Sequence, residues 1–197
     1  MTRADGRLHA RGPGVGRVLG IDCGSAKTGY GVIDIKGSAA QVVASGVILV
    51  SAQLSFPERL KKIGDELGRL IETHSPDAVA VEEVFYSVNV KSALKLGQVR
   101  GVALFMAADA ALPVYEYSPL QIKSSVVGYG RADKNQVQQM VKILLSLKEL
   151  PPEDAADALA VALCHAHCAQ TQEKLASARS GRTGPGPAAR AVQSPRI

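Results

Sequence analysis

RVLGID, at residues 17–22, is a short apolar run that ends in an acid just before a glycine-containing turn. A run of this kind is typical of a strand that is buried on both faces of a sheet. Two β-rich runs follow it, at residues 29–35 and 41–50, with Lys-Gly-Ser at 36–38 between them. The three segments are therefore predicted to form a meander of adjacent strands.

Helices and strands alternate after the meander. Ser55 and Pro57 begin a helix whose leucines and isoleucines share one face, and Ser75-Pro76 ends it. Buried strands are predicted at 78–82 (AVAVE) and 114–117, and further helices at 92–112, 120–127, 134–147 and 153–170. The order β-β-β-α-β-α-β-α predicts an α/β fold with a mixed five-stranded sheet and helices on both faces. This is the architecture of the ribonuclease-H-like group.

The composition predicts a protein that is neither membrane-spanning nor secreted. The 197 residues are 46% hydrophobic and 21% charged, as in globular proteins. The longest apolar candidate, Gly101–Val114, is shorter than a membrane span and contains an aspartate and a proline. Since no apolar signal segment precedes Asp22, the three cysteines are predicted to be reduced thiols of a cytoplasmic protein.

The net charge of +5 is concentrated at the two ends of the chain. Residues 1–16 carry +2 and residues 171–197 carry +4, which leaves −1 for residues 17–170. Both ends lack apolar periodicity, so we predict a flexible extension (1–16), one domain (17–170) and a disordered basic tail (171–197). Such basic ends either screen a polyanion such as nucleic acid or only aid solubility.

Four acids stand where a carboxylate needs an explanation. Asp22 and Glu82 each end an apolar strand, where a carboxylate is costly unless it is paired or bound to a cation. Asp154 and Asp157 stand three apart in PPEDAADALA and project from one helix face. Each has an ordinary alternative: a turn residue for Asp22, and helix capping for the last two. Glu83 lies on the opposite strand face from Glu82, and the pattern alone does not choose between them.

Four converging carboxylates would form a site of strong negative potential. Hard divalent cations such as Mg²⁺ prefer oxygen ligands of this kind. Two such ions about 3.5–4 Å apart can activate a water molecule and stabilise the leaving oxygen of a phosphodiester. Together the four acids favour a metal site, for which two Mg²⁺ ions in each subunit are expected, with Mn²⁺ able to substitute.

Five segments resemble RuvC-type Holliday junction resolvases. They span nearly all of residues 17–168 in the family's order: LGIDCGSAKTGYGVI (19–33), VEEVF (81–85), NVKSALKLGQVRGVA (89–103), VYEYSPLQIKSSVVGYGRADKNQV (114–137) and DAADALAVALCHAH (154–167). The resemblance implies a homodimer that nicks four-way DNA junctions in a Mg²⁺-dependent reaction during recombination and repair. It also implies the RuvA–RuvB branch-migration complex as a partner.

The resemblance assigns roles to individual residues. The family's catalytic, metal-binding carboxylates fall on Asp22, Glu82, Asp154 and Asp157. Its Glu-x-x-Phe pattern selects Glu82 over Glu83, since Phe85 follows three residues later. Family lysines that contact junction phosphates or support catalysis fall on Lys123 and Lys134, although most lysines in proteins are simply solvated.

Three further residues are expected to contact DNA. The family aromatic that stacks on an unpaired base falls on Phe85, whose alternative is burial in the core. Tyr86 beside it and Arg131 are expected as additional contacts. Cys23 departs from the family pattern, which usually has proline after the first aspartate.

A dimer follows from the substrate, because a four-way junction has approximate two-fold symmetry and paired nicks need two active sites. The helix around Gly97 and Gly101 is the candidate interface, since two glycines four apart allow a close backbone approach. The alternative is close packing of this helix on its own sheet.

Three other functions remain open on the residues alone. An actin/hexokinase-type ATPase or sugar kinase would use the glycine-containing turn after Asp22 for phosphate, but it needs a second such hairpin and gives Asp154 and Asp157 no role. A ribonuclease-H-like nuclease acting on RNA would use the same metals. A junction-binding module without catalysis would be expected if one of the four acids were missing, and none is.

Overall fold

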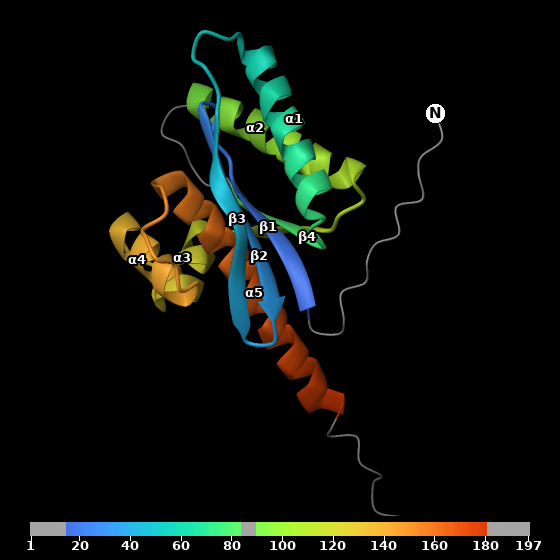
Figure 1. The fold of residues 1–197 in the computed structure, drawn as a ribbon, viewed down its shortest axis with the longest axis vertical. Helices are drawn as coiled ribbons and strands as arrows, with labels where there is room; N and C mark the ends of the chain where they lie inside the picture. Colours follow the sequence, from blue (N-terminus) through green and yellow to red (C-terminus); the bar gives the residue numbers. More distant parts are fainter. Residues whose placement is uncertain (1–14, 84–89, 181–197) are drawn as a thin grey trace, which may run out of the picture.

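A mixed five-stranded sheet lies at the centre of the fold (Figure 1). The computed structural model describes residues 15–83 and 90–180. Across the sheet the strand order is β3-β2-β1-β4-β5, with β1 (Val15–Asp22), β2 (Lys27–Lys36), β3 (Ala39–Leu49), β4 (Ala78–Glu82) and β5 (Val114–Tyr117). The first three strands form an antiparallel meander, and β4 and β5 lie parallel to β1. The predicted mixed sheet is confirmed.

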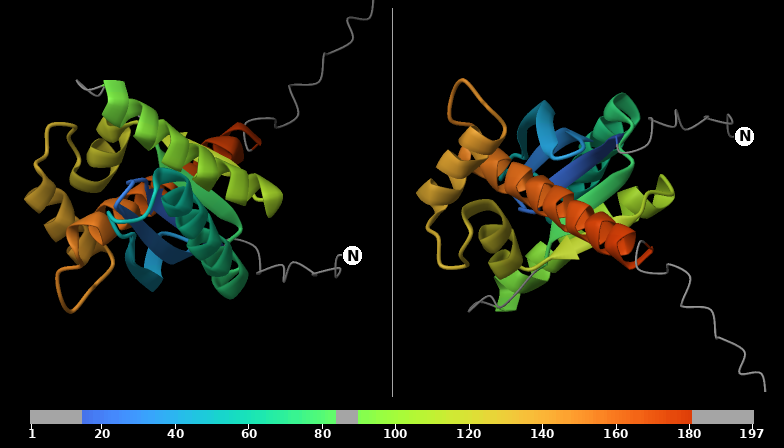
Figure 2. Two further views of the ribbon diagram at one scale, coloured as in Figure 1. Left: turned by 90° about the horizontal axis from the view of Figure 1, so that it is seen from above. Right: turned by 90° about the horizontal axis from the view of Figure 1, so that it is seen from below.

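Helices cover both faces of this sheet, as predicted (Figure 2). They are α1 (Phe56–His74), α2 (Val90–Asp109), α3 (Pro119–Val127), α4 (Lys134–Leu144) and α5 (Glu153–Ser180). One face packs against α1 and α2, and α5 lies across the other face with α3 and α4 against it. None of the helices in the described ranges combines the length and apolar character that crossing a bilayer requires.

Alternation along β1 divides its side chains between the two cores. Leu19 and Ile21 are fully buried under α1 and α2, whereas Val18 packs on the α5 side. Gly20 shares the face of Val18, and a Cβ atom there would lie 2.2 Å from the carbonyl oxygen of Ala158 in α5. The absence of a side chain at Gly20 therefore allows the backbone of α5 to lie directly against β1.

The ends of α4 and α5 differ from the predicted ends. The sequence predicts that α4 continues to Leu147, but the helix ends earlier because Ser146 adopts a left-handed backbone with φ 51°. No glycine marks this position in the sequence. The last helix was expected to end at Gln170 but continues to Ser180, since the residues there are mostly good helix formers. The start of the predicted basic tail is thus helical, and residues 1–14 and 181–197 lie outside the described ranges.

Candidate active site

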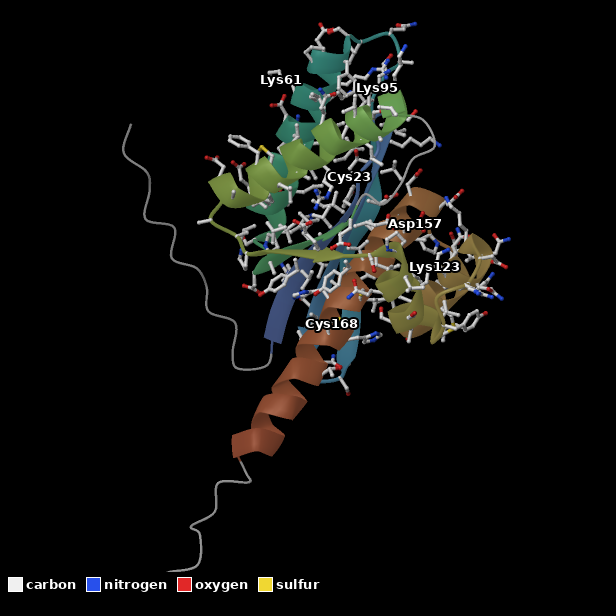
Figure 3. All side chains as sticks on the ribbon, turned by 180° about the vertical axis from the view of Figure 1, so that it is seen from behind. Cys23, Lys61, Lys95, Lys123, Asp157 and Cys168 are labelled. Carbon is white, nitrogen blue, oxygen red and sulfur yellow. The ribbon has the colours of Figure 1, made fainter. Side chains whose placement is uncertain are left out.

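A cavity of about 310 Å³ lies at the carboxyl ends of β1 and β4. Charged side chains from five elements line it: Asp22 (β1), Glu82 (β4), Lys123 (α3), Lys134 (α4) and Asp157 (α5). Figure 3 shows Asp157 and Lys123 projecting from α5 and α3 at the same end of the sheet. In α/β proteins, functional groups gather beyond the carboxyl ends of parallel strands. Segments far apart in sequence therefore converge on one charged cavity.

The register of β1 and β4 brings the first two acids together. Ile21 pairs with Val81 across the parallel strands, so Asp22 and Glu82 follow side by side. Strand alternation places both acids on the α5 face, because Val81 packs in the opposite core under α1 and α2. Glu83 belongs to the other face, and its backbone N–H donates to the carbonyl of Tyr117. Glu82 therefore lines the cavity with Asp22, and Glu83 is not among its lining residues.

Glycines in β2 determine how closely the start of α5 approaches Asp22. Gly29 pairs with Asp22 in the antiparallel register. A Cβ atom at Gly29 would lie 1.9 Å from the carbonyl oxygen of Asp154, and one at Gly31 would lie 2.7 Å from the side chain of Leu159. Because Gly29 and Gly31 have no side chains, the first turns of α5 pack directly on β2. Asp154 and Asp157 therefore lie near the carboxyl end of β1, where Asp22 stands.

Asp154 is placed beside the cavity rather than among its lining residues. Its side chain is 33% exposed, and its Oδ2 atom lies 4.0 Å from Nζ of Lys27 at the start of β2. Its charge still contributes to the raised pKa of Asp22. Three of the four predicted acids thus share the cavity, and the fourth lies one turn earlier on α5 with a lysine partner.

The acids raise one another's pKa values. Burial is the largest cause that raises the pKa of Asp22 to about 7, and the negative charges of Asp157, Glu82 and Asp154 follow. Burial also raises the pKa values of Glu82 and Asp157, while the ammonium groups of Lys123 and Lys134 act in the opposite direction on both. The buried carboxylates of the cavity are therefore destabilised in their charged forms, and a cation bound there would stabilise them.

We expect Asp22→Asn to stabilise the metal-free protein at pH 8. A carboxyl whose pKa rises from 3.8 on folding to about 7 binds its proton more tightly in the folded state, so wild-type stability falls as the pH rises between these values. The Asn variant lacks this loss, and its Tm in chelator should exceed that of the wild type by about 3–6 °C. Thermal unfolding from pH 4 to pH 8 measures both curves.

The control for this experiment is Asp109→Asn, which removes an exposed acid at the end of α2. Its Tm should follow the wild-type curve at every pH. A Tm for Asp22→Asn that is lower than wild type at pH 8 would contradict the unfavourable charge assigned to the buried carboxylate.

The carboxylate oxygens of the cavity suit a hard divalent cation whose coordination shell is completed by further ligands. The oxygens of Asp22, Glu82 and Asp157 line one cavity, and a cation would relieve their repulsion. Across residues 15–83 and 90–180, no group of three His, Cys, Asp or Glu side chains is close enough to hold one ion alone. Mg²⁺ commonly binds through one or two carboxylates together with water and substrate phosphates. The residues thus fit a metal whose coordination is completed by water or by substrate phosphates.

Arg131 and Cys23 are not among the residues that line this cavity. Arg131 is exposed in the turn between α3 and α4. Phe85 and Tyr86 lie outside the described residues. Cys23 follows Asp22, and burial together with the charge of Asp22 raises the pKa of its thiol to about 12. At neutral pH this cysteine is therefore a protonated thiol, which is a poor metal ligand.

Two charged residues beside the acids were missed in the sequence. Lys27 contacts Asp154, and Glu153 accepts a hydrogen bond of 2.5 Å from Nζ of Lys134. Glu153 could have been noticed, because it directly precedes Asp154 in the first turn of α5. The position of Lys27 depends on the register of β2 against β1, which the sequence pattern does not specify.

Comparison with known proteins identifies the family. The family model for crossover junction endodeoxyribonuclease RuvC matches residues 18–165. The RuvC of Alkaliphilus oremlandii is 54% identical over 151 residues, which are 76% of this chain and 92% of the relative. The RuvC of Geobacter sp. strain M21 is 52% identical over 162 residues, which are 82% of this chain and 99% of the relative.

A solved structure shares the same architecture. Thermus thermophilus RuvC in complex with Holliday junction substrate superposes with a TM-score of 0.76 and 39% identity, over 80% of this chain and 96% of that one. The family match extends from β1 into α5 and so spans all five strands of the sheet, which has the ribonuclease-H-like fold. On this evidence the chain belongs to the RuvC family of crossover junction endodeoxyribonucleases.

Proposed function

We propose that this chain is a structure-selective endonuclease that resolves four-way DNA junctions by paired symmetric nicks in opposing strands, in recombination and DNA repair. The observation that carries the proposal is the meeting of Asp22, Glu82 and Asp157 with two lysines in one cavity. The substrate is supported by the Thermus thermophilus relative, whose structure contains a Holliday junction. Acidic groups that suit a divalent metal, together with cations that suit phosphate, support phosphodiester hydrolysis.

The proposed metal ligands are the four acids of β1, β4 and α5. Asp22, Glu82, Asp154 and Asp157 would hold two Mg²⁺ ions in each subunit, with Mn²⁺ able to substitute. When bound, such ions activate water and stabilise the leaving oxygen of the phosphodiester. The chain itself fixes the carboxylates on two adjacent strands and one closely packed helix, so little rearrangement is needed when the substrate binds.

The lysines of the cavity have a complementary role. Lys123 and Lys134 project into it from α3 and α4, opposite the acids of the sheet. An ammonium group donates hydrogen bonds to the oxygens of the scissile phosphate and offsets the charge that builds up in the transition state. Three further residues are proposed to contact the junction beyond the reacting phosphate: Arg131, and Phe85 and Tyr86, which lie outside the described residues.

The exposed face of α2 supports a homodimer. Its members recur at helical spacing and face away from the sheet: Val90, Leu94, Gly97, Gly101 and Phe105. A Cβ atom at Gly97 or Gly101 would meet nothing within 4 Å among the described residues, so these glycines do not serve close packing of α2 on its own sheet. Leu94 and Phe105 are 64% and 65% exposed. A second copy of the chain, related by a two-fold axis, would bury this apolar face.

Leu94→Asp is expected to convert the dimer to a monomer, because two like charges would face each other across the two-fold axis. Sedimentation should show the change in mass, and paired nicking of one junction should fall by about tenfold or more while binding remains. Ile143→Asp is the matched control, since Ile143 is 65% exposed on α4. A Leu94→Asp protein that sediments as a dimer would rule out this interface.

The domain boundaries, the protein partner and the cellular location are also proposed. The family match over residues 18–165 supports residues 17–170 as the nuclease domain. Residues 1–16 and 171–197 are proposed to be basic arms, since their net charges of +2 and +4 suit a polyanion such as DNA. The RuvA–RuvB branch-migration complex is the proposed partner. The cytoplasm is the proposed site of action.

One experiment distinguishes the proposal from its rivals. The protein is incubated with a labelled four-way junction, a linear duplex, an RNA–DNA hybrid and ATP, each with Mg²⁺ or with chelator. We expect symmetric nicks in the junction alone and only with Mg²⁺. Cleavage of the hybrid alone, hydrolysis of ATP, or junction binding without nicks would instead support a ribonuclease, an ATPase or a non-catalytic module.

A further inference from the structure

Lys134 is held between two acids of α5. Its backbone is fixed at the first position of α4, where Asp133 is the N-cap and accepts a hydrogen bond from the backbone of Gln136. Its Nζ atom donates a hydrogen bond of 2.5 Å to Oε1 of Glu153 and lies 3.9 Å from Oδ2 of Asp157. The ammonium group therefore bridges α4 and the first turns of α5.

Glu153 and Asp157 differ in what else they face. The two residues are one helical turn apart and so share a face of α5. Asp157 lines the cavity with Asp22, whereas the side chain of Glu153 is 59% exposed beside it. Glu153 is thus placed to hold the lysine at the mouth of the cavity without itself meeting a phosphate in the interior.

We propose that Glu153 is a positioning residue that keeps the ammonium group of Lys134 over the cavity before the scissile phosphate arrives, an inference that rests on the proposed role of Lys134. A lysine side chain has four carbons and many rotamers, and fixing it during the reaction has an entropic cost. The contact with Glu153 already restricts the rotamers of Lys134 before the substrate binds, so less side-chain entropy is lost during the reaction. The ammonium group then requires only a short movement toward a phosphate oxygen next to Asp157.

The proposal predicts a particular kinetic pattern. Glu153→Gln keeps the size of the side chain but removes the charge that holds Lys134, so kcat for junction cleavage should fall. Since the pair is largely exposed, the expected fall is about two- to fivefold. KM should remain equal or decrease, because one negative charge beside a polyanion is removed. Glu153→Asp keeps the charge on a shorter stem and should recover part of the rate.

Four full-length proteins test the coupling: wild type, Glu153→Gln, Lys134→Ala and the double variant, each assayed by single-turnover cleavage of a four-way junction with saturating Mg²⁺. We expect Lys134→Ala to lower the rate by about 10²-fold. In that background Glu153→Gln should have no further effect. Glu149→Gln is the matched control, because it removes an exposed charge from the turn before α5. It should cleave at the wild-type rate, and all variants should keep the wild-type Tm within about 2 °C.

Four results would overturn the proposal. A wild-type cleavage rate for Glu153→Gln would show that Lys134 acts without being positioned by Glu153. A rate above wild type would show that Glu153 holds Lys134 away from the phosphate. A further loss of rate in the double variant would show that Glu153 acts on something other than the lysine. If Lys134→Ala alone cleaves normally, the role of the lysine is wrong and the positioning role falls with it, whereas junction nicking by the wild type still supports the overall function.

Discussion

Asp22→Asn is expected to bind a four-way junction as the wild type does and to cleave it at least about 10³-fold more slowly. Asp22 lies between Glu82 on the neighbouring strand and Asp157 on α5, and is the most strongly perturbed acid of the cavity. Asparagine keeps the shape but provides one neutral oxygen in place of an anionic pair. Loss of one group that stabilises developing charge commonly costs about 10²–10³-fold in rate. Asp22→Asn would in addition weaken the proposed metal site.

The measurement is single-turnover cleavage alongside a binding titration in chelator. Asp109→Asn, on the exposed end of α2, should cleave and bind like the wild type. Binding and catalysis separate in this test because the phosphate backbone is attracted mainly by the lysines, whereas hydrolysis needs the carboxylates. An Asp22→Asn protein that retains a tenth or more of the wild-type rate would contradict a central role for this acid.

Gly29→Ala is expected to lower cleavage by about 10²-fold without changing any charged residue. The new Cβ atom would lie 1.9 Å from the carbonyl oxygen of Asp154, so the start of α5 must move away from the sheet. Asp154 and Asp157 would move with it relative to Asp22. A displacement of about 1 Å in a catalytic arrangement can cost about 10²-fold in rate. The strain should also lower stability by about 1–3 kcal/mol.

Gly16→Ala is the matched control for this prediction. Gly16 lies in β1, but a Cβ atom there would meet nothing within 4 Å of the described residues. The control should retain full activity and stability. Thermal unfolding shows whether the Gly29→Ala protein is folded at the assay temperature, and a folded variant that cleaves at the wild-type rate would show that the close approach of α5 does not position the acids.

The sequence predicts the strands of this fold better than the ends of its helices. Residues 17–22 and Ala78–Glu82 are apolar runs too short for a typical helix and each ended by an acid, which favours a buried strand. Helix ends depend on single backbone conformations instead. Ser146 ends α4 in a left-handed conformation that serine rarely adopts, so composition gives no warning.

The sequence predicts the acids of the site but little of their surroundings. A carboxylate after a buried strand is unusual enough to single out Asp22 and the pair Glu82 and Glu83 on energetic grounds. Only the family resemblance selects Glu82 from that pair. The lysines are different, because an exposed lysine is the ordinary case and only the family resemblance singled out Lys123 and Lys134. The contact between Lys27 and Asp154 depends on tertiary register, which no local pattern contains.

The most direct test of the metal site is anomalous diffraction from crystals of the protein with Mn²⁺ and an uncleavable four-way junction. We predict anomalous peaks inside the cavity, between the carboxylates of Asp22, Glu82 and Asp157 and the phosphate at the crossover. Peaks found only elsewhere, with these carboxylates turned away from the phosphate, would contradict it.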